Sequence, residues 1–118
     1  MTAVAKKWTG GGQEGVHFFC PGCKEVHTIR YAPTGWTWNG SLEKPSFTPS
    51  VLVNGHELIH DENGRWTGDY KRDGSGNLIK SLCHSFVTDG RIHFLGDCTH
   101  ALSGQSVDLP PWQHGDGE

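Results

Sequence analysis

Four cysteines in a short, glycine-rich chain constrain the fold of this protein most strongly. Cys20 and Cys23 are separated by a proline and a glycine, whereas Cys83 and Cys98 lie far along the chain. The Pro-Gly pair permits a tight loop in which two thiolates bind one ion while nearby amides donate to their sulfurs. Only 34% of the 118 residues are hydrophobic, and so small a core usually needs a metal or disulfides. We therefore expect a zinc-stabilised fold.

The sequence around the first two cysteines separates a metal site from a redox pair. The N-terminal segment lacks the apolar stretch of an export signal, so we expect a cytoplasmic protein with reduced thiols. A redox Cys-x-x-Cys pair normally begins a helix, but residues 26–31 have the pattern of a strand.

No apolar run is long enough to span a membrane. The net charge of −3 disfavours nucleic acid as a partner.

A hairpin is expected to bring the other two cysteines together. Asp89-Gly90 is typical of a two-residue type I′ turn, which pairs residues 82–88 with residues 91–98 and sets Thr88 opposite Arg91. Side chains alternate between the faces of a strand, so both cysteines fall on the hydrophobic face. The predicted zinc ligands are Cys20, Cys23, Cys83 and Cys98. A small buried side chain is the alternative role for Cys83.

Two histidines could replace one of the cysteines as a ligand. His100 lies two residues after Cys98, so an extended segment puts both side chains on one side. His27 follows Cys23 by four residues and is also within reach. We therefore keep both as alternative ligands.

The polar face of the same hairpin carries candidate catalytic residues. His84 and Asp97 are diagonal neighbours in the predicted register. A carboxylate beside an imidazole orients it, either as a base or as a metal ligand. We predict that this pair lies on the face opposite Cys83. The candidate catalytic residues are His84, Asp97 and His100.

Residues 56–60 match the H-E-x-x-H pattern of metalloproteases. That pattern needs a helix, on which the two histidines share a face. Turn-forming residues precede and follow the segment here, which leaves less than two helical turns. The alternation of residues 51–59 fits a strand and a turn at least as well. We interpret the match as incidental.

The whole chain reads as a small all-β or β-dominated single domain with a zinc-knuckle hairpin and long glycine-rich loops. Residues 1–12 are predicted to be a flexible arm, and residues 112–118 a polar tail. The domain occupies residues 13–111, with a variable insert at residues 54–80 that contains a long loop or irregular hairpin.

Several motifs together resemble a known protein family. It is a family of small proteins of unknown function from tailed phages and prophages, some of whose members carry the label "ammonia monooxygenase". The resemblance rests on residues 19–23 with His27, and on residues 36–40, 44–51, 83–87, 89–92, 94–102 and 104–110. It implies a phage or prophage origin and a metal site at the four cysteines. It implies no established activity.

Two classes of function follow from these features. In the first, the chain is a binding module with structural zinc, and its partner is a host or phage macromolecule in the bacterial cytoplasm. In the second, it is a small zinc-dependent hydrolase that uses His84, Asp97 and His100. Four cysteine ligands would favour the binding module, because a closed site leaves no position for a substrate or a catalytic water.

Overall fold

A computed structural model describes residues 2–112 of the chain, and it confirms the expected β fold. These residues contain no helix, and so none that could cross a membrane. The predicted polar tail falls mostly on residues 113–118, outside the described residues. The strands are β1 (Ala5–Gly10), β2 (Gln13–Cys20), β3 (Glu25–Ala32), β4 (Thr37–Trp38), β5 (Phe47–His56), β6 (Leu58–His60), β7 (Trp66–Tyr70), β8 (Lys80–Thr88), β9 (Arg91–Phe94) and β10 (Ser106–Asp108).

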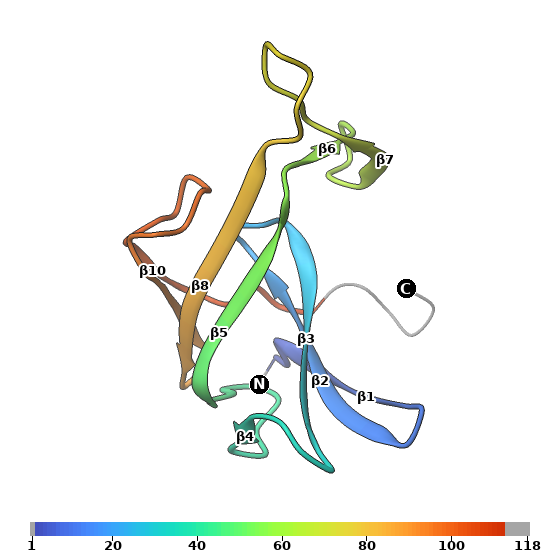
Figure 1. The fold of residues 1–118 in the computed structure, drawn as a ribbon. Coiled ribbons are helices and arrows are strands. Elements are labelled where there is room, and N and C mark those ends of the chain that lie inside the picture. The colour runs from blue at the N-terminus through green and yellow to red at the C-terminus, as the bar shows by residue number, and fades with distance from the viewer. Residues whose placement is uncertain (1, 113–118) are drawn as a thin grey trace.

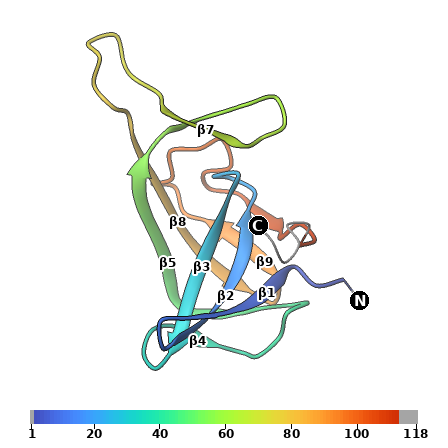
Figure 2. The same cartoon turned by 90° about the vertical axis from the view of Figure 1, so that its right-hand side faces the viewer.

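Two antiparallel sheets pack against each other. The first has the order β1-β2-β3, and the second has the order β10-β9-β8-β5-β4 (Figure 1). Figure 2 shows the shorter sheet in front of the longer one. The rings of Phe18 in β2 and Phe47 in β5 stack across the interface, with centroids 6.0 Å apart. The core therefore lies between the sheets, as in a β-sandwich.

Each sheet contributes alternate residues to this core. In β2, Val16, Phe18 and Cys20 are buried, and in β8 the buried residues are Cys83, Ser85 and Val87. Residues two apart on a strand share a face, so these side chains meet between the sheets. Cys20 and Cys83 thus reach the interface from opposite sheets, as part of the same alternation that builds the hydrophobic core.

The predicted hairpin register is confirmed near its turn. Thr88 is paired with Arg91, and both Asp89 (φ 50°) and Gly90 (φ 80°) have the positive φ that a type I′ turn requires. The ladder ends at the pair Ser85–Phe94, earlier than predicted. Beyond Phe94 the chain leaves the strand and turns.

The N-terminal segment differs from the predicted flexible arm. Residues 5–10 form β1, which is hydrogen-bonded along β2. The amides of Val4 and Ala5 both donate to the carbonyl of Leu42, at 2.9 and 3.2 Å. Both residues are buried, so the segment completes the core instead of extending into solvent.

Within the predicted insert, β6 and β7 pair into a small separate hairpin, seen at the top of Figure 1.

Candidate functional site

The Cys-Pro-Gly-Cys segment forms a knuckle between β2 and β3. Cys20 is the last residue of β2, and the chain reverses over the next four residues before Glu25 begins β3. The amide of Lys24 donates to the Cys20 carbonyl at 2.8 Å, and Lys24 itself has a positive φ of 59°. The amide of Cys23 points at the Cys20 sulfur, 3.4 Å away. Amide donation of this kind stabilises a thiolate that binds a metal.

Four potential metal ligands meet between the two sheets. The Sγ atoms of Cys20, Cys23 and Cys83 and a ring nitrogen of His27 all lie within 4.8 Å of one another. Cys20 Sγ and Cys83 Sγ are 3.9 Å apart, close to the separation of about 3.8 Å for two sulfurs on one tetrahedral zinc ion. His27 Nε2 is buried and has no hydrogen-bond partner. The donor atoms therefore fit a metal ion, which would join the two sheets.

The three thiols of this cluster shift one another's pKa values. Hydrogen bonds from Cys23 and Cys83 lower the pKa of the Cys20 thiol far below its usual value. The hydrogen bond to Cys20 raises the pKa of Cys23 to about 12, and it also raises the pKa of Cys83. One thiolate is thus favoured while its neighbours keep their protons. A divalent cation would allow all three sulfurs to ionise.

The structure brings His27, and not Cys98, into the group of four. Cys98 belongs to a second group, in which its Sγ lies near Cys83 and His100. His100 Nε2 is also buried without a partner, and its ring packs directly over Gly22, where a larger residue would overlap it. The predicted four-cysteine site therefore remains a prediction. Of the two alternative histidine ligands, His27 belongs to the group of four and His100 to the second group.

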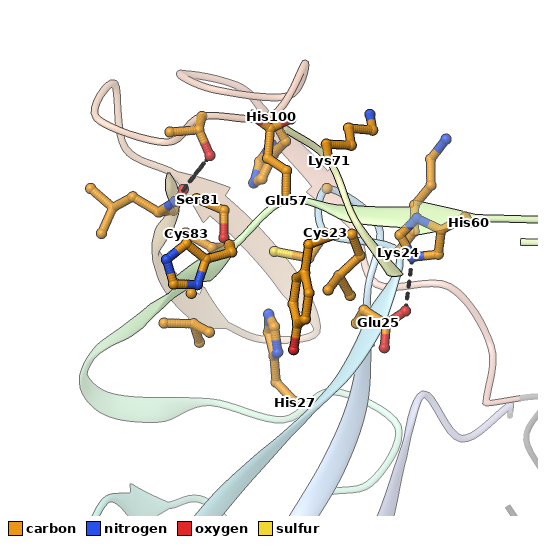
Figure 3. A pocket seen from close by; sticks show the side chains of 18 of the residues that line it. Cys23, Lys24, Glu25, His27, Glu57, His60, Lys71, Ser81, Cys83 and His100 are labelled. Atoms are coloured by element: carbon orange, nitrogen blue, oxygen red, sulfur yellow. Dashed lines mark hydrogen bonds and ion pairs between the residues drawn. The ribbon is translucent and has the colours of Figure 1, made fainter. Parts of the chain in front are cut away.

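A cavity of about 680 Å³ opens beside this cluster. Cys23, Cys83, His27 and His100 line it, and Figure 3 shows the two histidines on opposite sides of the Cys23 sulfur. The opening lies between the knuckle and the β6–β7 hairpin.

The H-E-x-x-H segment takes no part in a metal site among the described residues. Its first histidine ends β5, and the second lies in β6, so the segment is extended, as predicted. His60 Nε2 lies within hydrogen-bonding distance of Glu25 Oε2, at 2.8 Å. The pattern therefore lacks the helix on which its two histidines would share a face.

A second arrangement of polar residues lies on the outer face of the five-stranded sheet. Ser50 Oγ is 3.0 Å from His84 Nε2, and His84 Nδ1 is 3.2 Å from Asp97 Oδ2. The predicted contact between His84 and Asp97 is therefore present. The His84 side chain is 26% exposed and that of Asp97 is 50% exposed, so solvent reaches the group. Serine and aspartate each contact one ring nitrogen of the histidine, which is the connectivity of a catalytic triad.

Two irregularities of the sheet bring Ser50 and Asp97 to His84. Phe47 is paired with Val87 and Val51 with Ser85, so β5 contains two more residues than β8 over this stretch. Such a bulge re-aims side chains, and Ser50 lies within it. The turn after β9 places Asp97 against His84 from the other side.

Sequence reasoning identified His84 and Asp97 but missed Ser50. The two residues of the hairpin are linked by a short turn, whose register can be derived locally. Ser50 reaches His84 because β5 pairs with β8, and nothing in the intervening residues indicates that pairing. One available signal was the alternation after Pro49, which puts Ser50 on the polar side of a strand whose next residue, Val51, is buried.

The structure thus defines a small β-sandwich with a metal-ligand cluster inside and a Ser–His–Asp arrangement outside. Residues 3–95 match the family described as "Bacterial ubiquitination-like system serine protease (BubE)". The match covers most of the chain, and the protein belongs to this family. The matched segment includes Ser50 and His84 and ends two residues before Asp97. No curated protein and no solved structure matches the chain.

Proposed function

We propose that this protein is a serine protease whose nucleophile is Ser50, whose general base is His84 and whose orienting carboxylate is Asp97. The observation that carries the proposal is the pair of hydrogen bonds to the two nitrogens of His84, at 3.0 and 3.2 Å. The family description, which names a serine protease, supports it independently. The family also suggests that the substrate is a protein of a bacterial ubiquitination-like system.

The geometry assigns a role to each side chain in acyl transfer. With its proton on Nδ1, the His84 ring donates a hydrogen bond to the Asp97 carboxylate, which fixes the ring, while Nε2 faces the Ser50 hydroxyl. Nε2 takes the hydroxyl proton as the Ser50 oxygen bonds to the carbonyl carbon of the substrate. The protonated ring then donates to the leaving amine as the carbon–nitrogen bond breaks. Water then gives a proton to Nε2 as its oxygen bonds to the acyl carbon. The ring returns this proton to the Ser50 oxygen as the ester bond breaks, so that the carboxylic acid product leaves and the free enzyme returns.

A fluorophosphonate probe is expected to label Ser50 in the full chain. The activated serine oxygen bonds to phosphorus and displaces fluoride, so the product is stable and can be located by peptide mass spectrometry. Ser50→Ala should abolish labelling. Ser106→Ala is the matched control, because Ser106 Oγ contacts a different histidine, His93, at 2.6 Å on the neighbouring strands. An unlabelled protein, or a label on another serine, would contradict the proposal.

We further propose that the inner cluster holds zinc through Cys20, Cys23, His27 and Cys83. Four protein ligands complete a tetrahedral site, which makes the role of the ion structural. His84 and Asp97 belong to neither group of potential ligands among the described residues. A zinc-bound water acting with them, as in the hydrolase expected from the sequence, therefore has no support. A binding module with structural zinc fits the same cluster but gives the triad no role.

Metal analysis of the purified, reduced protein is expected to find about one zinc per chain. His56→Ala and His60→Ala should keep that content, because one residue ends β5 and the other pairs with Glu25. His27→Ala should lose zinc or bind it much more weakly, since a ligand is removed. Loss of zinc from the His60 variant, with full zinc content in the His27 variant, would show that the metal binds at the H-E-x-x-H segment instead.

A further inference from the structure

The segment that carries Asp97 follows β8 beyond the end of β9. The amide of Leu95 donates to the His84 carbonyl at 2.9 Å, and the amide of Thr99 donates to the Leu82 carbonyl at 2.9 Å. Between these two bonds the chain turns outward at Gly96 and Asp97. The segment therefore leaves the ladder for two residues and rejoins it, and Asp97 is at the tip of the excursion.

Where the segment leaves the ladder, side chains form the hydrogen bonds to β8 that a paired strand would form with its backbone. Cys98 Sγ lies 3.2 Å from the backbone nitrogen of His84 and 3.2 Å from its carbonyl oxygen. Thr99 Oγ1 accepts from the amide of Leu82 at 3.0 Å. The buried thiol thus accepts from and donates to the backbone of His84, as a strand residue would.

We propose that Cys98 is a positioning residue for the triad. It follows Asp97 directly, and its side chain binds the backbone of His84, so it fixes both partners of the 3.2 Å contact between Nδ1 and the carboxylate. The Asp97 side chain is half exposed, and exposed contacts of this kind are weak unless the backbone is held in place. The thiol supplies that restraint from the inner face of the sheet. This inference rests on the proposed protease function for its catalytic consequence, and on the contacts of Cys98 for its structural one.

Two substitutions of Cys98 separate hydrogen bonding from packing. Cys98→Val puts two methyl groups in place of the sulfur, which gives a somewhat larger apolar side chain without the hydrogen bonds, whereas Cys98→Ser keeps both hydrogen-bonding functions in a smaller side chain. We expect the rate of Ser50 labelling by the fluorophosphonate to fall by about 10²-fold in the Val variant, because misplacement by about 1 Å costs that much. The Ser variant should recover about tenfold of that loss. Thr99→Val is the matched control, since it removes a bond to Leu82 instead, and should change the rate by less than about threefold.

A readout independent of catalysis tests the same contact. The proton on His84 Nδ1, held by Asp97, should give a protected downfield resonance in the unsubstituted chain, in Ser50→Ala and in Cys98→Ser, but not in Cys98→Val. Its persistence in the Val variant overturns the inference, whether or not the protein is a protease. If the resonance follows Cys98 while no variant reacts with the probe, the protease proposal fails and the positioning role stands.

Three further outcomes would also overturn the inference. A Val variant that outperforms the Ser variant, in folding or in labelling, assigns Cys98 to packing and overturns the inference. Parallel loss of zinc and labelling in both variants assigns Cys98 to the metal, with the same consequence. In the unsubstituted chain, the His84 amide should exchange slowly with solvent hydrogen because Cys98 Sγ accepts from it. Exchange as fast as that of an exposed amide would overturn the inference without any substitution.

Discussion

Ser50→Ala is expected to lower the hydrolysis of peptide and ester substrates by about four to six orders of magnitude, while the protein stays folded. Removal of a nucleophilic serine from a triad has an effect of this size, because the covalent path is lost and only binding remains. The hydroxyl contributes little to packing, since Ser50 is partly exposed on the outer face of its sheet. Release of p-nitrophenolate from p-nitrophenyl acetate, with circular dichroism as the folding control, measures both parts of the expectation.

The comparison with the other members of the triad makes this experiment specific. His84→Ala should be as damaging as the serine variant, and the double variant should be no worse than either, because the two residues act as one unit. Asp97→Asn should be severely impaired with the fold intact, since the amide can hold His84 in the wrong tautomer. Hydrolysis by Ser50→Ala above about 1% of the unsubstituted rate would rule out Ser50 as the nucleophile.

Cys20→Ser and Cys23→Ser are expected to unfold the domain at room temperature. Structural zinc contributes about 10–16 kcal/mol to folding in small domains, which is as large as the whole stability of a typical protein. The cluster joins the two sheets through Cys20 and Cys83, at the end of β2, in a chain that is only 34% hydrophobic. Far-ultraviolet circular dichroism and zinc content, measured with and without a chelator, report the result.

Cys98→Ser is the matched control for this second experiment. It replaces another buried cysteine with the same residue, but Cys98 lies outside the group of four. We expect this variant to remain folded and to keep its zinc. If Cys20→Ser stays folded without metal while Cys98→Ser unfolds, the ligand set is wrong. Chelation of the unsubstituted protein should reproduce the Cys20 phenotype, and added zinc should reverse it.

Local sequence determined the parts of this protein that short-range physics controls. The knuckle follows from Pro21 and Gly22 between two cysteines, and the hairpin register follows from Asp89-Gly90, whose positive φ values are confirmed. The contact of His84 with Asp97 was predicted from that register, although the ladder ends before it reaches them and the turn after β9 brings the carboxylate to the ring. These predictions succeed because turn chemistry and the alternation of strand side chains act over a few residues.

The tertiary structure alone decided which distant residues meet. His27 joins Cys83 because the two sheets face each other, and Ser50 reaches His84 because β5 pairs with β8 and carries an irregular register. Sheet pairing between segments more than thirty residues apart depends on packing over the whole core. A bulge moreover shifts a side chain by an amount that no alternation pattern predicts. The sequence by itself therefore indicated a metal site and two members of the proposed triad, and only the pairing of β5 with β8 supplied the proposed nucleophile.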